Sequence, residues 1–262
     1  MDHIISPIRN FTKIVDLHTF TVVALACIAT YFCLEYEVYI DLPTALIGIA
    51  IVFPIVFSIN AAYRRREDAL KYFGSLKAHA VALYYAHRDW VPDPASDHAM
   101  RMKSIFEELL QAIHQYFTSK GEHNDFDRVY NHFSKLSNSM ELLRDAGVAA
   151  NEISRCNQYL RSMMIDFENM RNIRLYRTPT TLRAYSQVFL NIFPILFAPY
   201  FAYIANESYY ASGFIVAVVY GLVLVSLDNI QEDLENPFDG IGSDDLRLDV
   251  AANYQKILVT GE

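Results

Sequence analysis

The chain has 262 residues, of which 53% are hydrophobic and 14% aromatic, so it has enough apolar material for one large core. A charged fraction of 20%, with nine Gly and nine Pro, excludes a disordered or collagen-like chain. The formal net charge of -8 argues against a nucleic-acid binder, because such proteins need a basic surface to neutralise phosphate.

Four long apolar runs lie in two stretches of the chain that contain no Lys or Arg, at residues 19–34, 42–63, 184–206 and 208–227. A bilayer core about 30 Å thick requires about 20 mainly apolar residues per helix, and about 17 as a minimum. Three runs reach that length, and the first reaches it when Leu17 and His18 are included. We therefore predict four transmembrane helices in two pairs, at residues 17–36, 42–63, 183–206 and 208–227.

The positions of Lys and Arg predict how these helices cross the membrane. Cytoplasmic loops retain these cations, whereas short translocated loops lack them. The two short connections contain Glu35, Glu37, Asp41 and Glu207 and neither Lys nor Arg, so all 22 cations fall on the other side. With four crossings, both termini and the polar middle share that side. We predict a multi-pass protein of the cell (inner) membrane with both termini in the cytoplasm.

The polar middle, residues 64–180, has the pattern of a helical cytoplasmic region. Apolar residues recur at intervals of three and four from Leu70 to Tyr84, so the second membrane helix should continue to about Trp90, where two prolines follow. Further amphipathic helices are expected after Ser96 or Asp97, at 126–143 and at 148–173. The predicted fold class is all-α, with a single domain over 1–262 and an acidic cytoplasmic tail at 228–262.

Sequence signals for an enzyme lack their structural context. His87-Arg88-Asp89 matches the catalytic-loop triplet of kinases, but no Gly-rich loop, strand lysine or Asp-Phe-Gly accompanies it. Gly240-Ile241-Gly242 lacks the preceding strand and third glycine of a dinucleotide loop, and the chain contains no HExxH or GxSxG. We predict that the protein is not an enzyme and requires no cofactor.

The second apolar run contains Ile49, Phe53 and Phe57, which are spaced by four and therefore lie along one side of a helix. Spacing alone favours an aromatic stripe that packs against a neighbouring helix. The alternative is a hydrophobic constriction, in which rings of apolar side chains from several subunits gate ions by controlling wetting. Four helices in one chain do not enclose a pore unaided, so a pore would require a symmetric oligomer.

Three segments of the chain resemble the bestrophin ion channels. The end of the second membrane helix, Phe57-Ser58-Ile59-Asn60-Ala61-Ala62-Tyr63-Arg64-Arg65-Arg66-Glu67-Asp68-Ala69, is similar to the family segment after a pore phenylalanine. Arg177-Thr178-Pro179 resembles the motif before the third membrane helix. The most specific likeness is Asp228-Asn229-Ile230-Gln231-Glu232-Asp233-Leu234-Glu235-Asn236-Pro237-Phe238, followed by Asp244-Asp245-Leu246.

The resemblance implies a homopentamer around one central pore, with Ile49, Phe53 and Phe57 lining a narrow neck. It also implies a second constriction in a cytosolic cavity, on a helix near residues 150–160, where the alternatives are Ile153, Ser154 and Asn157. Family precedent favours chloride and other small anions as the permeant ions. The acidic outer loops favour cations if they face the pore entrance, so a cation-conducting member of the same fold is an alternative.

In animal members of the family, the acidic stretch after Asn-Pro-Phe helps to form a calcium clasp. Here Asn236, Asp239, Asp244 and Asp245 could supply the oxygen ligands that calcium needs. This sequence departs from the uninterrupted acidic run of the family, because residues 240–243 are inserted within it. The insertion favours a solvated or cap-forming acidic tail over a calcium site.

The principal hypothesis is therefore a pentameric channel that conducts small ions through a hydrophobic neck. Its expected partners are other copies of the chain, the permeant ions and the lipid bilayer, with no nucleic acid. A second hypothesis is a membrane-anchored scaffold whose helical cytoplasmic domain binds a protein partner. A metal-dependent membrane enzyme is the weakest hypothesis, because the acidic cluster has no accompanying histidines.

Overall fold

A computed structural model describes residues 14–92, 97–119, 123–176, 180–240 and 244–258. Within these ranges the regular elements are helices, and no strand is present. The predicted all-α fold class is confirmed for this part of the chain.

The chain divides into two compact units. Unit 1 comprises residues 1–64 and 178–235, and unit 2 comprises residues 65–177 and 236–262. The division falls inside one long helix, α3 (Thr44–Asp89), which contributes its first part to unit 1 and its later part to unit 2. The single domain over 1–262 stays a prediction.

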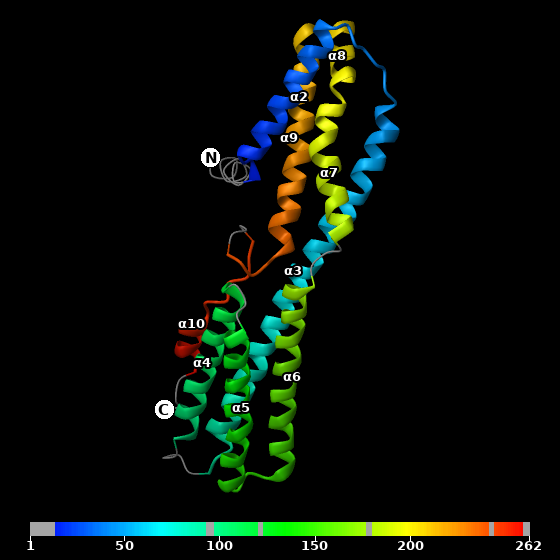
Figure 1. Cartoon of the computed structure of the whole chain (residues 1–262). Helices are drawn as coiled ribbons and strands as arrows, with labels where there is room; N and C mark the ends of the chain where they lie inside the picture. Colours follow the sequence, from blue (N-terminus) through cyan, green and yellow to red (C-terminus); the bar gives the residue numbers. More distant parts are fainter. Residues whose placement is uncertain (1–13, 93–96, 120–122, 177–179, 241–243, 259–262) are drawn as a thin grey trace, which may run out of the picture. The chain divides into compact units, whose positions relative to one another are not determined.

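Unit 1 is a bundle of apolar helices. Besides the first part of α3, it contains α2 (Leu17–Glu35), α7 (Thr180–Leu196), α8 (Ala198–Glu207) and α9 (Tyr210–Glu235). Helices α2, α7 and α9 lie side by side, and α8 packs on α2 and α9 (Figure 1). The buried centre of this bundle consists of Ile55, Leu190, Phe197, Phe201, Ala217 and Leu224.

Three stretches of unit 1 are long and apolar enough to cross a membrane, Leu17–Glu35, Gln187–Glu207 and Tyr210–Glu235. They coincide with three of the four predicted spans. The remaining predicted span, 42–63, is helical from Thr44 onwards, but several of its side chains lie outside those described. A count of four spans therefore stays a prediction.

The third predicted span is not one continuous helix. It breaks at Phe197, so that α7 ends at Leu196 and α8 begins at Ala198. Pro199 has no N–H to donate to the carbonyl four residues earlier, and Pro194 causes the same loss within α7. Helical bonding resumes where the N–H of Phe201 donates to the carbonyl of Phe197 at 3.0 Å. A count of apolar residues does not reveal this break, whereas the two prolines inside the run are its sequence signal.

The fourth predicted span is the first part of a longer helix. Residues 228–235, predicted to begin the acidic tail, continue α9 as far as Glu235, and Pro237 follows its end. Gly213 allows α9 to approach α8 closely, because a Cβ at this position would lie 2.2 Å from the carbonyl oxygen of Phe201. A small residue therefore fixes the spacing of these two helices.

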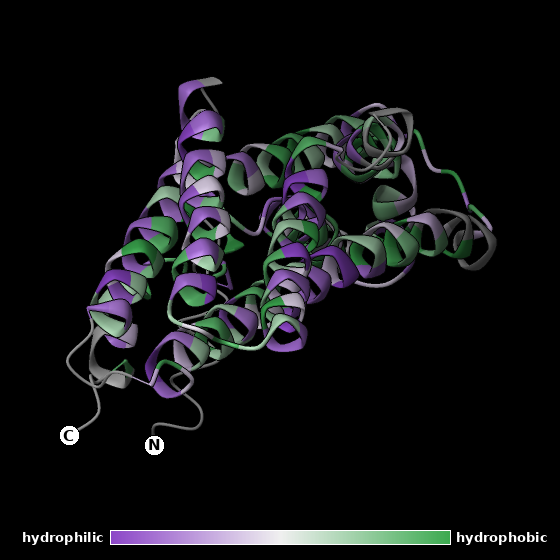
Figure 2. Cartoon of the chain, turned by 90° about the horizontal axis from the view of Figure 1, so that it is seen from below, coloured by the Kyte–Doolittle hydropathy of each residue, from purple (hydrophilic) through white to green (hydrophobic). Residues whose placement is uncertain are grey.

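Unit 2 is a bundle of amphipathic helices. It contains the later part of α3 together with α4 (His98–Thr118), α5 (His123–Asp145), α6 (Ala150–Leu175) and the short α10 (Ala251–Ile257). Helix α5 packs on α4 and on α6, and α10 packs on α4 (Figure 1). Figure 2 shows hydrophilic and hydrophobic residues mixed along the same helices, which is typical of helices with one buried face.

The turn between α5 and α6 follows from one glycine. Gly147 has a φ of 80°, and its N–H donates to the carbonyl of Arg144 at 3.0 Å. The next N–H, of Val148, donates to the carbonyl of Leu143, also at 3.0 Å. This Schellman pattern satisfies the last carbonyls of α5 and requires the left-handed backbone that glycine adopts at low cost.

Candidate ion-conducting site

The predicted neck residues lie on the part of α3 that belongs to unit 1, and all three are exposed. The exposed fractions of Ile49, Phe53 and Phe57 are 66%, 62% and 56%. The rings of Phe53 and Phe57 meet edge to face, with centroids 4.8 Å apart. Together with Val52 and Val56, which are also exposed, these residues form a continuous apolar surface, which we name the exposed stripe of α3.

The opposite side of the same helix segment packs inside unit 1. Ile55 is buried against Leu190 and Phe197, and Ser58 is buried as well. The side of α3 that packs within the chain is therefore not the side that carries Ile49, Phe53 and Phe57. Among the described residues of this chain the stripe is mostly exposed, and both interpretations of it stay predictions. The stripe remains available to a second subunit, to lipid or to an ion path.

A polar network within unit 1 explains part of the Asp228-Asn229 motif. The side-chain amide of Asn191 on α7 donates to the Asp228 carboxylate at 3.3 Å, and His18 Nε2 lies 2.9 Å from the Asn191 side-chain oxygen. Asn229 donates to the carbonyl of Ile14 at 2.6 Å. Polar groups in a membrane bundle require such partners. The sequence analysis missed Asn191, whose only signal is an amide inside an apolar run.

The arginines after the exposed stripe act within unit 2. The Arg65 guanidinium donates to the carbonyls of Ile173 and Tyr176 at the end of α6, where helical carbonyls lack partners of their own. Arg66 Nε donates to the carbonyl of Asp244 at 2.9 Å. This part of the motif therefore stabilises a helix end and the segment that follows Asn-Pro-Phe.

The tail after α9 is docked through its apolar residues. Phe238, the aromatic residue of Asn-Pro-Phe, is buried in the core of unit 2, and its ring centroid lies 4.4 Å from that of Phe117. Leu246 and Leu248 are buried in the same core, and the N–H of Leu246 donates to the carbonyl of Pro237 at 2.9 Å. The tail was expected to be solvated, and its carboxylates at 239, 244 and 249 are indeed exposed. Phe238, Leu246 and Leu248, however, pack in the core of unit 2, so the tail is only partly solvated.

Calcium binding at Asn236, Asp239, Asp244 and Asp245 stays a prediction, and the structure shows what contacts some of these residues make. Asn236 uses its side-chain amide to donate to Asp239 at 2.6 Å, and the carbonyl of Asp244 accepts from Arg66. Across the described residues, no three His, Cys, Asp or Glu side chains are grouped so that they could hold a metal ion.

The three alternatives for a cytosolic constriction differ in exposure. All lie on α6, but Ile153 is buried in the core of unit 2, where it cannot line an open cavity. Ser154 and Asn157 are exposed on the same helix. Ser154 and Asn157 therefore have accessible side chains, and the position of a constriction on this helix stays a prediction.

Apolar helices of membrane-spanning length in one unit, and amphipathic helices in the other, define the class as a helical membrane protein. Solved structures with this fold are bacterial bestrophin homologues. One from Klebsiella pneumoniae is 20% identical, with a TM-score of 0.77, covering 94% of this chain and 98% of that chain. Another structure of the Klebsiella homologue has a TM-score of 0.74 at 20% identity, covering 92% and 95% of the two chains. The chain therefore has the bestrophin fold that its motifs predicted.

Sequence comparison adds one curated relative. A voltage-dependent anion channel-forming protein of Mesorhizobium japonicum is 31% identical over 97 residues, which are 37% of this chain and 31% of the relative. The matched stretch thus spans about a third of the relative's length. No protein-family model matches the chain.

Proposed function

We propose that this protein is an ion channel of bestrophin type, without catalytic activity, in which the exposed stripe of α3 lines the neck of the pore. The observation that carries the proposal is the stripe itself. Its apolar side chains are exposed on a membrane-unit helix whose opposite side is already packed. The bestrophin fold and the name of the Mesorhizobium relative support the same function.

An apolar neck constrains how such a channel works. The side chains of Ile49, Phe53 and Phe57 offer no oxygen to replace the hydration shell of an ion, so the neck acts as a steric and wetting barrier. Charge preference then comes from the regions on either side of the neck. In this proposal Ser154 and Asn157 contribute a polar constriction further along the path.

One chain presents only one such stripe, so the proposal requires several copies around an axis. We propose a homopentamer. Mass determination of the purified protein in lipid nanodiscs tests the copy number directly. A mass that corresponds to another number of subunits would contradict the pentamer but not the channel. A mass that corresponds to a monomer would contradict the pore itself.

We propose that the channel favours chloride and other small anions. The name of the Mesorhizobium relative supports anions, whereas the acidic connections with Glu35, Glu37, Asp41 and Glu207 favour cations. A reversal potential measured in planar bilayers across a potassium chloride gradient separates the two. A potential near the chloride equilibrium value supports anion selectivity, and a potential near the potassium value assigns the protein to the cation-conducting alternative.

The proposed location is the cell membrane, with both termini in the cytoplasm. This orientation places the cation-free connections outside, as the distribution of Lys and Arg requires. Labelling of intact cells at a cysteine placed at Asn206, next to Glu207, tests it, because only an outside connection reacts with a membrane-impermeant reagent.

The scaffold hypothesis makes the opposite prediction about transport. A membrane-anchored interaction protein needs no ion path, so the purified protein would carry no current. We expect ion flux from proteoliposomes that contain the protein alone. Absence of flux under every ion gradient, voltage and calcium concentration would replace the channel by the scaffold.

A further inference from the structure

A pocket opens in unit 2, and none of its lining residues belongs to the exposed stripe. It has a volume of about 460 Å³ and is lined by the end of α3, the first half of α4 and the second half of α5. A site of this size is within the range of small-molecule pockets. None of the functions proposed above uses it.

The floor of the pocket contains two histidine rings. His87 on α3 and His98 on α4 stack with ring centroids 5.9 Å apart and an interplanar angle of 29°. The Ser139 hydroxyl donates to the carbonyl of Leu136 at 2.7 Å, so its oxygen accepts from His87 Nε2, which lies 3.2 Å away. His87 is therefore held with its proton on Nε2. Burial, with the nearby His98 as a second cause, lowers the pKa of His87 to about 4, which keeps the ring neutral at pH 7.

His98 offers a polar atom to a ligand. Its Nδ1 is buried, and among the residues that the structure describes it has no hydrogen-bond partner. A buried polar atom without a partner is costly. In the tautomer that carries the proton on Nδ1, a ligand oxygen that accepts from this N–H would remove the cost.

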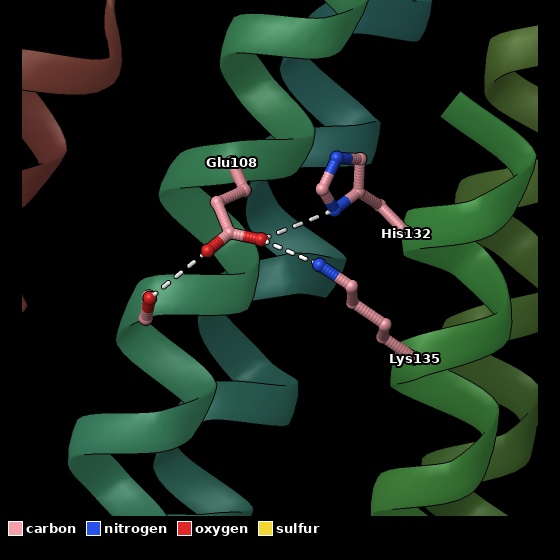
Figure 3. A network of polar contacts seen from close by, with 4 residues as sticks. Glu108, His132 and Lys135 are labelled. Carbon is pink, nitrogen blue, oxygen red and sulfur yellow. Dashed lines mark hydrogen bonds and ion pairs between the residues drawn. The ribbon is translucent and has the colours of Figure 1, made fainter. Parts of the chain in front are cut away.

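The acidic side chain on the pocket wall is already neutralised. Glu108 Oε2 lies 2.7 Å from Lys135 Nζ and 3.5 Å from His132 Nδ1, and Ser104 donates to the other carboxylate oxygen at 3.3 Å (Figure 3). Burial and then the charge of Lys135 lower the pKa of His132, so the cation that balances Glu108 at pH 7 is Lys135.

Arg101 adds a positive charge to the same wall. Its guanidinium lies 4.0 Å from the Asp97 carboxylate, which is outside the pocket lining, and both side chains are mostly exposed, so this ion pair is weak. With Glu108 and Lys135 balanced, the described lining carries one net positive charge at pH 7. Apolar surface lies beside this charge, on Met102, Ile105 and Leu142.

We propose that this pocket binds a small organic monoanion, namely a carboxylate with a compact apolar body. The carboxylate accepts hydrogen bonds from Arg101 and from His98, and the apolar body lies on Met102, Ile105 and Leu142. A planar guanidinium suits this head group because it binds carboxylates with two parallel hydrogen bonds. The proposal does not depend on the proposed channel function, because it rests on residues of unit 2 alone.

Calorimetric titration of the full chain in lipid nanodiscs tests the ligand class with three probes. Benzoate carries both the charge and an apolar ring, benzamide keeps the ring without the charge, and inorganic phosphate keeps the charge without the ring. We expect saturable binding of one benzoate per chain, and binding at least about tenfold weaker for each of the other two. If benzamide binds as tightly as benzoate, the charge of Arg101 does not contribute to binding. If phosphate binds as tightly as benzoate, the apolar surface does not contribute.

Paired variants test whether benzoate occupies this pocket. Arg101→Gln removes the positive charge, and Arg144→Gln is its control, an exposed arginine on α5 that pairs with Glu141. Ser104→Trp fills the pocket from an exposed position, and Ser137→Trp places the same ring on an exposed position of α5 outside the lining. We expect Arg101→Gln and Ser104→Trp each to weaken benzoate binding about tenfold or more, and both controls to bind as the unmodified chain does.

Binding that survives both pocket substitutions would overturn the site. Such binding would place benzoate elsewhere, for example as a permeant anion in the pore. Failure of the channel proposal is measured separately, as absence of ion flux. The outcomes of the two proposals are therefore distinguishable.

Discussion

Helix α3 carries two apolar stripes with the same helical spacing and opposite surroundings. In unit 1 the exposed stripe, which includes Phe53, lies outside the buried cluster of the described chain and is mostly accessible. In unit 2 a buried stripe of α3 packs in the core, formed by Ala69, Phe73, Leu76, Ala80, Leu83, Tyr84 and His87. Periodicity thus shows that a face is apolar, but it does not show whether the same chain covers it. Two stripes with the same spacing thus differ only in what the rest of the chain places against them.

Two phenylalanines on this helix test the comparison most directly. Phe73 is 2% exposed and Phe53 is 62% exposed. We expect Phe73→Ala to lower the free energy of unfolding by about 3–5 kcal/mol, because it leaves a cavity in a packed core. Phe53→Ala should change it by less than about 0.5 kcal/mol, as at other exposed positions. Thermal and denaturant unfolding of the full chain in detergent measures both, and equal losses would contradict the comparison.

A buried imidazole on the same stripe predicts a pH dependence. The pKa of His87 is about 4 in the folded chain, and that of an unperturbed histidine is 6.5. Between these values the unfolded chain binds more protons, so stability is complete above pH 6.5 and falls as the pH drops towards 4. The expected loss is about 3 kcal/mol, since one pKa unit corresponds to about 1.4 kcal/mol.

His87→Gln is the variant that isolates this effect. It keeps a donor for Ser139 but does not titrate, so its stability should depend less steeply on pH over the same range. The measurement is the difference in unfolding midpoint between pH 7 and pH 4.5 for the two proteins. Identical pH dependence would show that other groups cause the loss.

Ion flux tests whether the exposed stripe of α3 lines the neck of a pore. Replacement of Ile49, Phe53 and Phe57 together with Ala widens and wets the proposed neck, so conductance should rise, by about tenfold if the barrier falls by about 1.4 kcal/mol. Ile215→Ala is the control, since Ile215 is an exposed apolar residue on α9. Currents in planar bilayers that are unchanged in the triple variant would remove these residues from the neck.

Calcium provides the smallest expected effect. Asp239 and Asp244 are exposed, and the described residues contain no group of three His, Cys, Asp or Glu that could hold a metal ion. If the exposed stripe alone sets conductance, removal of calcium with a chelator should leave the currents as they were. A loss of current on chelation, restored by calcium and abolished by Asp244→Asn, would assign a calcium site to this segment.

The sequence predicted helices and motifs well, since both depend on local chemistry. The helix predicted at 148–173 corresponds to α6, and the gap left between it and the helix predicted at 126–143 contains a glycine cap at Gly147. The acidic residues around Asn-Pro-Phe predict a solvated tail, whereas Phe238 of the same motif is buried in the core of unit 2. The sequence signal for this packing is the alternation of apolar and polar residues at Leu246, Arg247 and Leu248, since both leucines are buried.

By itself the sequence determined the all-α class, three helices of membrane-spanning length and the likeness to bestrophins, because apolar length, helical spacing and motif spelling are local properties. Only the tertiary structure decided which apolar faces the chain covers for itself. It buried Ile153 and left Ser154 exposed, and it left Phe53 exposed while covering Phe73. Burial depends on which distant segments pack together, and a local pattern carries no record of that packing.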